Sequence, residues 1–376
     1  MLRTYEQLKE LRSPSEEEFM LIDRLQKIES VINQYGENNF AISFSGGKDS
    51  TVLSALIDLA LPGNQIPRVY VNTGIELNMI KDFVLDVAKT DSRVDIIKPQ
   101  VPIKPMLQKE GYPFKSKKHA HIVERYRRIG MCDSVQSYLG NGTWGPKQQC
   151  PKILKYQFTP LFSAQLPISD HCCLRMKEEP LIKWGKDHNR PITIVGIMRE
   201  EGGRRENAVC LAFEHGELKK FQPMSVVTKK WEEWFIKEYK VSICPIYYPP
   251  YNFVRTGCKG CPFALNLQKE LDTLEKYFPD ERKQCEYIWG PVYEEYRRLG
   301  YRLPKTPDKV WLRFPDKQAY FSNENTLAAL SDPKGTQKLC VFVEKERQYK
   351  MISCKITKLD ELNLIQTFGQ DNVKIS

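Results

Sequence analysis

The chain has 376 residues, of which 41% are hydrophobic, which is enough to bury the core of one large domain or two ordinary ones. Its net charge of +10 favours a polyanionic partner such as a nucleotide or a nucleic acid. No run of about 18 apolar residues is present and the N-terminus lacks the apolar stretch of a secretory signal, so we expect a cytoplasmic protein with no membrane partner.

The first element in chain order is a helix, predicted to begin after residues 13–15 and to end at Gly36. Strands are expected at 39–45, 68–72, 94–97 and 192–197, and the intervening helices at 50–61, 80–88 and 180–188. Strands that alternate with helices predict an α/β fold, in which a parallel twisted sheet of Rossmann-like type is flanked by helices.

The segment 101–160 differs from the segments around it. It carries eleven Lys and Arg residues against three acidic ones, a net charge of +8, interleaved with aromatic residues and glycine-rich turns. Two interpretations remain open, a solvated insertion and a surface that binds a polyanion.

The rest of the chain completes the expected division. Helices are predicted at 267–277 and 287–299, and strands at 338–345 and 350–356. We expect an N-terminal helical segment at 1–35, a nucleotide-binding domain at 36–262 that includes the basic insertion, a helical region at 263–325, and a small α/β appendage at 326–376.

The strongest motif is Ser45-Gly46-Gly47-Lys48-Asp49-Ser50, between an expected strand and an expected helix. Two glycines let the backbone approach an anion and turn its N–H groups inward, the helix N-terminus adds its dipole, and the lysine adds a point charge. The spacing is not that of a Walker A loop, because the lysine directly follows the glycine pair. The motif therefore predicts a phosphate-binding loop of a different kind.

With these residues, the chain resembles the PP-loop ATP pyrophosphatase superfamily, in particular the phosphoadenosine phosphosulfate (PAPS) and adenylyl-sulfate reductases. Three further stretches within residues 36–262 share the resemblance: 71–76 (VNTGIE), 174–181 (LRMKEEPL) and 196–206 (GIMREEGGRRE). Asn72 stands where the family usually has Asp, and the Glu-Ser order that the family has in the last stretch is not kept.

The resemblance implies an adenine nucleotide α-hydrolase-like fold and a role for each matching residue. Ser45, Gly46, Gly47, Lys48, Asp49 and Ser50 would hold the phosphates, and Thr73, Gly74 and Glu76 would line the nucleotide. Lys177, Arg199 and Arg205 would present positive charge to phosphate or sulfate oxygens, for which a planar guanidinium is well suited. Lys48, Asp49 and Arg199 are the expected catalytic residues.

Two groups of cysteines form the second strong signal. Cys172 and Cys173 are adjacent, and Cys258 and Cys261 form a C-x-x-C turn 85 positions later. Cysteine-only ligation suits iron–sulfur or zinc, and the spacing alone does not choose between them. The resemblance favours a [4Fe–4S] cluster, which adenylyl-sulfate reductases hold in this way. Cys285 is a rival for one of the four ligand positions.

The C-terminal Glu-Cys-Gly-x-His tail, whose cysteine the reductases of this family use to release sulfite, is absent: no cysteine follows Cys354. This absence favours ATP cleavage to AMP and pyrophosphate with Mg²⁺, in sulfur transfer or nucleic-acid modification. A nucleic acid and a sulfur donor or thioredoxin-like protein are the partners this chemistry implies. A sulfonucleotide reductase and a non-catalytic nucleotide-sensing subunit of a defence system remain as alternatives.

Overall fold

The protein is represented by a computed structural model. The structure describes residues 2–159, 162, 165–202 and 205–305, and beyond them the backbone of strands at 310–313, 318–321, 337–343 and 348–354. The chain forms two compact units, each built from two stretches of sequence. Unit 1 consists of Met1–Ile103 and Cys173–Lys259, and unit 2 of Lys104–Cys172 and Gly260–Ser376.

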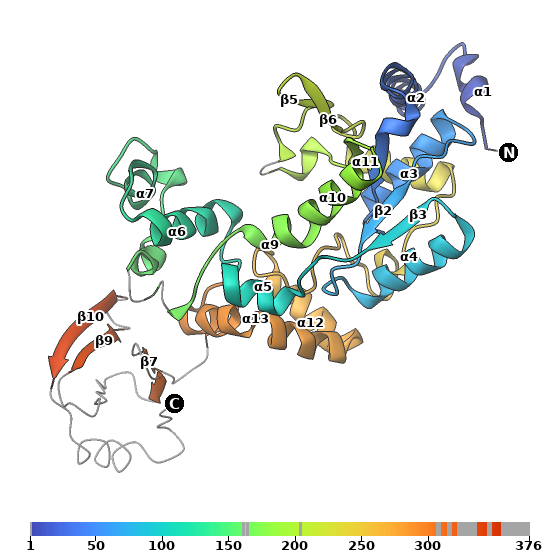
Figure 1. The fold of residues 1–376 in the computed structure, drawn as a ribbon. Coiled ribbons are helices and arrows are strands. Elements are labelled where there is room, and N and C mark those ends of the chain that lie inside the picture. Colours follow the sequence, from blue (N-terminus) through green and yellow to red (C-terminus); the bar gives the residue numbers. More distant parts are fainter. Residues whose placement is uncertain are drawn as a thin grey trace. The chain divides into compact units, whose positions relative to one another are not determined.

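Unit 1 is built on a six-stranded sheet with the order β3-β2-β1-β4-β6-β5 (Figure 1). Its strands are β1 Phe40–Ser43, β2 Arg68–Val71, β3 Val94–Ile97, β4 Ile192–Ile194, β5 Leu211–Glu214 and β6 Glu217–Phe221. All neighbours pair in parallel except β5 and β6, which are antiparallel. The predicted α/β fold with a mostly parallel sheet is confirmed.

Helices cover both faces of this sheet, and its central strands β1 and β4 are mostly buried. The helices of unit 1 are α1 Tyr5–Lys9, α2 Glu16–Tyr35, α3 Lys48–Ala60, α4 Asn78–Thr90, α10 Glu179–Asp187 and α11 Lys229–Glu238. Phe40 and Ile42 of β1 join a core with α2, α3 and α11 on one face, and Ala41 between them meets Trp184 of α10 on the other. Because successive side chains of β1 point to opposite faces of the sheet, this one strand packs against helices on both faces.

The helix predicted up to Gly36 is α2, and its ends follow from local chemistry. The Ser15 side chain accepts a hydrogen bond from the Glu18 N–H and the Glu18 carboxylate accepts one from the Ser15 N–H, which is a capping box. Gly36 ends the helix at a φ of 82°. The segment predicted as a separate part at 1–35 belongs to unit 1, because α2 packs on α3.

The four predicted strands of unit 1 are present, and its predicted helices end within two residues of the observed ones. The sequence interpretation missed the hairpin of β5 and β6 and the helix α11. Among the described residues of unit 1, 3-10 turns include Glu37–Asn39, Arg199–Glu201 and Pro245–Tyr247, which lie in the loops. A π-helical turn, Leu174–Glu178, precedes α10.

Unit 2 contains the basic segment, which is folded and has a core of its own. The helices whose bounds the structure describes in this unit include α5 Ile103–Glu110 (from Lys104 on), α6 Lys117–Ile129, α7 Asp133–Leu139, α12 Leu267–Tyr277 and α13 Pro279–Leu299. The short 3-10 turns Pro146–Gln148 and Lys152–Gln157 follow α7. The helix α9 (His171–Cys173) ends at the first residue of the second stretch of unit 1. α13 begins eight residues before the start predicted at 287.

The backbone of four strands is described after residue 305 in unit 2: β7 Val310–Arg313, β8 Gln318–Phe321, β9 Gln337–Val343 and β10 Gln348–Cys354. They form an antiparallel sheet with the order β10-β9-β7-β8. β9 and β10 correspond to the two strands predicted in this region. None of the helices in the described part of the chain combines the length and apolarity needed to cross a membrane.

His119 of α6 lies at the centre of the unit 2 core, with no exposed surface. Its Nδ1 is 2.9 Å from the Tyr138 hydroxyl and its Nε2 is 2.6 Å from Oε1 of Gln157. Both contacts are satisfied when Nε2 carries the proton and Nδ1 accepts from the tyrosine. Burial lowers the pKa of His119 to about 3, although the Gln157 contact opposes the shift.

We therefore expect His119 to make the protein less stable in acid. A histidine with a depressed pKa stays neutral when folded but binds a proton in the unfolded chain below about pH 6.5. The free energy of unfolding should fall by up to about 1.4 kcal/mol per pH unit from pH 6.5 downwards, from this group alone. Urea unfolding at pH 7.0 and 5.5 measures the slope. His119→Asn should be less stable at pH 7.0 and show a shallower slope, and an unchanged slope would contradict the assignment.

Candidate functional site

The predicted phosphate loop follows β1, the strand at which the strand order of the sheet reverses. β2 and β3 extend the sheet from one side of β1, and β4 and β6 from the other. Ligands of open α/β sheets bind at such a switch point, beyond the carboxyl ends of the strands. The loop leaves β1 after Ser43, and Gly47 is the N-cap of α3, which begins at Lys48 and runs for 13 residues.

Hydrogen bonds within the loop fix its shape. The Ser45 N–H donates to Oγ of Ser50 (3.1 Å), and the Ser50 hydroxyl lies 3.0 Å from the Gly47 carbonyl. The N–H of Lys48 donates to the hydroxyl of Tyr247 at 3.0 Å. That hydroxyl also bonds Thr256. The amide at the start of α3 therefore already meets an oxygen acceptor, which is the kind of partner that a phosphate offers.

Two glycines allow elements to approach the loop closely. Gly46 has a φ of 70°, and a Cβ built on it would lie 2.4 Å from Cγ2 of Val84. Gly196, which follows β4, faces the first turn of α3: a Cβ there would lie 2.9 Å from the Asp49 carbonyl oxygen. The stretch beginning at Gly196 and the phosphate loop, 150 residues apart in the sequence, are therefore in contact.

Gly46→Ala is accordingly expected to impair nucleotide binding strongly. The new methyl group collides with Val84 of α4 and the backbone adopts a φ that an L-residue disfavours. Gly63→Ala is a matched control, because Gly63 has a φ of 80° but no atom within 4 Å of the added Cβ. Titration with ATP should show a loss of affinity of at least about tenfold in Gly46→Ala beyond that in Gly63→Ala. Equal losses of ATP affinity in the two variants would show that the close approach of Val84 to Gly46 is not the cause.

A cluster of charged groups surrounds the start of α3. The Lys48 ammonium lies 3.2 Å from Oε2 of Glu232, a residue of α11 that is 0% exposed. This is an ion-pair distance, but neither carboxylate oxygen of Glu232 meets the geometry of a hydrogen bond in the described part of the chain. Burial, and then the charge of Asp49, raise the pKa of Glu232 to about 7, while Lys48 opposes the shift. Burial followed by Glu201 raises the pKa of Asp49.

The two arginines predicted for the site, Arg199 and Arg205, have different partners. Arg205 pairs with Glu201, and its charge lowers the pKa of Asp49, so it belongs to the loop cluster. The Nε of Arg199 donates a hydrogen bond of 2.6 Å to the Ala208 carbonyl. Its role at the phosphates stays a prediction. Arg204 lies outside the described residues.

The second predicted loop follows β2, beside β1 in the sheet. The N–H and hydroxyl of Thr73 both donate to the Glu76 carboxylate, and Gly74 has a φ of 77°. The carbonyl of Ile75 accepts the N–H of Lys259 at 2.8 Å, which ties this loop to the segment that carries Cys258.

Lys177 stands in the same neighbourhood, on the π-helical turn. The charges of Cys258, Glu76 and Cys173 raise its pKa, with Cys258 contributing most. Burial raises the pKa of Cys258 and Lys177 counteracts it. Unit 1 therefore brings together Glu76, Lys177, Cys173 and Cys258, all of which the sequence analysis selected.

The C-x-x-C turn continues into unit 2, where Gly260 has a φ of 60°. Its N–H donates to Oε1 of Glu270 at 2.9 Å and its carbonyl accepts the hydroxyl of Tyr293. A Cβ on Gly260 would lie 2.7 Å from Sγ of Cys285, so the rival ligand closely approaches this turn.

The predicted ligands are divided between the units: Cys173 and Cys258 belong to unit 1, and Cys172, Cys261 and Cys285 to unit 2. Within the described residues, no group of three or more His, Cys, Asp or Glu side chains is arranged as a metal site. The four-cysteine site thus stays a prediction.

Sequence reasoning missed Glu232, Tyr247 and Thr256. Glu232 had a detectable signal, because it interrupts an aromatic stripe between Trp231 and Phe235 at a position that a helix would bury. No motif marks Tyr247 or Thr256, which reach the loop only through the fold.

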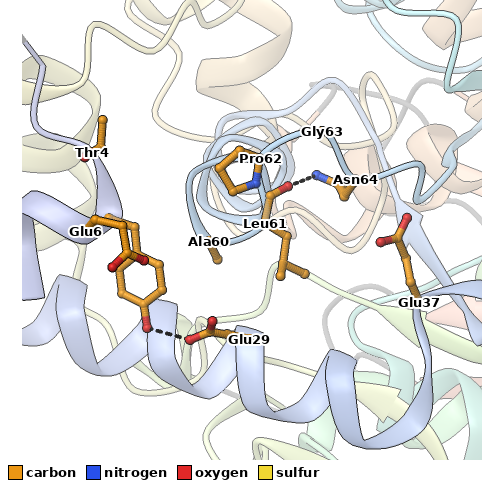
Figure 2. Close-up of a pocket in the computed structure, with 10 residues that line it drawn as sticks. Thr4, Glu6, Glu29, Glu37, Ala60, Leu61, Pro62, Gly63 and Asn64 are labelled. Carbon is orange, nitrogen blue, oxygen red and sulfur yellow. Dashed lines mark hydrogen bonds between the residues drawn. The ribbon is translucent and has the colours of Figure 1, made fainter.

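One cavity of unit 1 lies away from this site. It has a volume of about 370 Å³ and lies beyond the C-terminal end of α3, beside α1 and α2 (Figure 2). Glu6, Glu29 and Glu37 line it, with Tyr5 donating to Glu29. Three carboxylates make this cavity unsuited to a phosphate anion, and the loop at the carboxyl edge of the sheet is the better candidate.

Comparison with known structures finds similar folds at low identity. Phosphoadenylyl-sulfate reductase from Candida auris, in a phosphate complex, aligns with 62% of this chain and 91% of its own at 13% identity and a TM-score of 0.34. U34-tRNA thiolase NcsA from Methanococcus maripaludis, with its [4Fe-4S] cluster, aligns with 76% and 80% at 13% identity and a TM-score of 0.33. Yeast FAD synthetase in complex with FAD aligns with 74% and 82% at 10% identity and a TM-score of 0.38. No curated protein matches the chain.

The family model of the phosphoadenosine phosphosulfate reductase domain matches residues 39–142 and 149–264, more than half of the chain. The matched residues include the phosphate loop, the Thr73–Glu76 loop, Lys177 and the C-x-x-C turn. The chain belongs to the phosphoadenosine phosphosulfate reductase domain family.

Proposed function

We propose that this protein binds ATP or a related adenylyl nucleotide at the phosphate loop and acts at the α-phosphate, releasing AMP and pyrophosphate in a sulfur-transfer or nucleic-acid modification reaction. The observation that carries the proposal is the Ser45–Ser50 loop, which sits at the switch point of the sheet with Lys48 at the start of α3. Helix N-terminal amides and a lysine at such a point suit a phosphate anion.

The residues of the loop have distinct parts in this reaction. An oxygen of the acceptor attacks the α-phosphorus, the bond from that phosphorus to the bridging oxygen breaks, and pyrophosphate leaves with the electron pair. The amides at the start of α3 and the Lys48 ammonium would stabilise the charge that develops on pyrophosphate. Asp49 is the carboxylate that would hold a Mg²⁺ brought with the nucleotide. Arg205 adds positive charge beside Asp49.

The adenylylated acceptor then loses AMP to a sulfur nucleophile, and for this step we propose an iron–sulfur cluster on Cys172, Cys173, Cys258 and Cys261, with Cys285 as the rival. Cysteine thiolates are the donors that such a cluster requires. The Lys177 ammonium next to Cys258 favours its thiolate form, in which it would bind a metal. When bound, the cluster would orient the substrate or carry sulfur.

The acceptor we propose is a nucleic acid, in keeping with the net charge of +8 on residues 101–160. The side chains of Arg127, Arg128, Lys147 and Lys152 in this segment are exposed. A sulfur donor or thioredoxin-like protein is the second partner that the reaction requires.

Product analysis tests the nucleotide chemistry. Anaerobically purified protein is incubated with radiolabelled ATP and Mg²⁺, with and without bulk tRNA or DNA, and AMP and pyrophosphate are separated chromatographically. Their stoichiometric release supports the proposal. Thioredoxin-dependent sulfite release from adenylyl sulfate would instead establish a reductase, and tight ATP binding with no release under any of these conditions would indicate a nucleotide sensor.

A further inference from the structure

Glu232 is the least expected group at the loop. Its side chain is fully buried on α11, and a buried carboxylate is costly unless a charge compensates for it. The compensating charge is the ammonium of Lys48, 3.2 Å from Oε2. The lysine side chain is itself only 17% exposed, so solvent screens this contact weakly.

The same ammonium is the group that a bound phosphate requires. A lysine has four side-chain carbons and freely rotating bonds, so without a partner its ammonium would sample many positions. Contact with Glu232 confines it beside the start of α3, where the N–H of Lys48 also points toward an oxygen acceptor. A phosphate that arrives must then share the ammonium with Glu232 or take it over.

We propose that Glu232 is a positioning residue that holds the Lys48 ammonium ready at the phosphate loop and weakens nucleotide binding in return for faster turnover. The proposal rests on the nucleotide chemistry proposed above. Glu232 then has two opposite effects. Its negative charge repels the phosphates, and its ion pair with Lys48 holds the ammonium in the position from which it contacts them. Loss of the charge should tighten binding and slow the reaction.

The test compares wild type, Glu232→Gln and the matched control Glu233→Gln, whose residue is exposed on the same helix. ATP affinity is measured by calorimetric titration at pH 8, and pyrophosphate release gives kcat. We expect Glu232→Gln to bind ATP about three- to tenfold more tightly than wild type and to lose about tenfold in kcat. Glu233→Gln should match wild type in both affinity and kcat.

The Lys48→Ala background separates positioning from folding. If Glu232 acts through the lysine, adding Glu232→Gln to Lys48→Ala should leave kcat unchanged. Thermal unfolding of Glu232→Gln should occur at or above the wild-type temperature, because an amide is less costly to bury than a carboxylate.

Weaker ATP binding together with a lower kcat in Glu232→Gln would overturn the proposal. If wild type binds ATP but releases no pyrophosphate, only the proposed function is refuted. The difference in ATP affinity between wild type and Glu232→Gln would still test the role of Glu232. Wild type that binds neither ATP nor inorganic pyrophosphate would refute both.

Discussion

Lys48→Ala is expected to slow pyrophosphate release from ATP by about 100- to 1,000-fold while leaving the fold intact. The ammonium sits at the start of α3 and is the positive charge of the Ser45–Ser50 motif, so its loss removes stabilisation from the leaving pyrophosphate. Loss of one preorganised group of this kind costs about 100- to 1,000-fold in kcat. Removing the lysine leaves Glu232 buried without its ion-pair partner, but the raised pKa lets that carboxyl take up a proton instead.

Initial rates of pyrophosphate release, measured at saturating ATP, provide the result. Lys89→Ala serves as the control, because Lys89 is exposed at the end of α4 and pairs only with Asp86 among the described residues. The control should retain wild-type activity, and the circular dichroism of both variants should match that of wild type. A Lys48→Ala variant with more than about a tenth of the wild-type rate would show that the loop lysine is not the group that stabilises pyrophosphate.

The second large effect concerns iron. Anaerobically purified wild type should contain about four iron and four sulfide ions per chain and absorb broadly near 400 nm, as expected for a [4Fe–4S] cluster. Cys258→Ser should lose most of the iron and the absorbance, since a serine hydroxyl is a poor substitute for a soft thiolate. Cys210→Ser is the matched control, because Cys210 is also a partly buried free thiol of unit 1.

The same measurements on Cys172→Ser, Cys261→Ser and Cys285→Ser would identify the fourth ligand. Retention of iron in Cys172→Ser with loss in Cys285→Ser would assign the position to Cys285, which approaches the C-x-x-C turn at Gly260. If wild-type protein contains zinc and no iron, the cysteines form a structural zinc site and not a cluster. If it contains neither metal, the assignment of these cysteines as metal ligands is refuted.

The elements of the sheet were predictable because their signals are local. Short apolar strands bounded by glycine, and helices begun by caps such as Ser15, carry their information within a few residues. The hairpin of β5 and β6 was missed because its strands are partly exposed and charged: β6 reads Glu217–Phe221 (ELKKF), which has no run of apolar residues. The start of α13 was missed because Pro279 marks a first turn that is otherwise entirely polar.

The sequence by itself determined the family, the phosphate loop, the parallel sheet and the candidate cysteines, because each depends on residue types at short spacing. Only the tertiary structure decided which distant groups surround the loop. Glu232 is 184 positions from Lys48 and Tyr247 is 199, and no local pattern encodes such a contact. The packing of α11 on α3 and the strand order bring them together. The sequence motif therefore identifies Lys48, whereas only the fold shows that the carboxylate of Glu232 pairs with it.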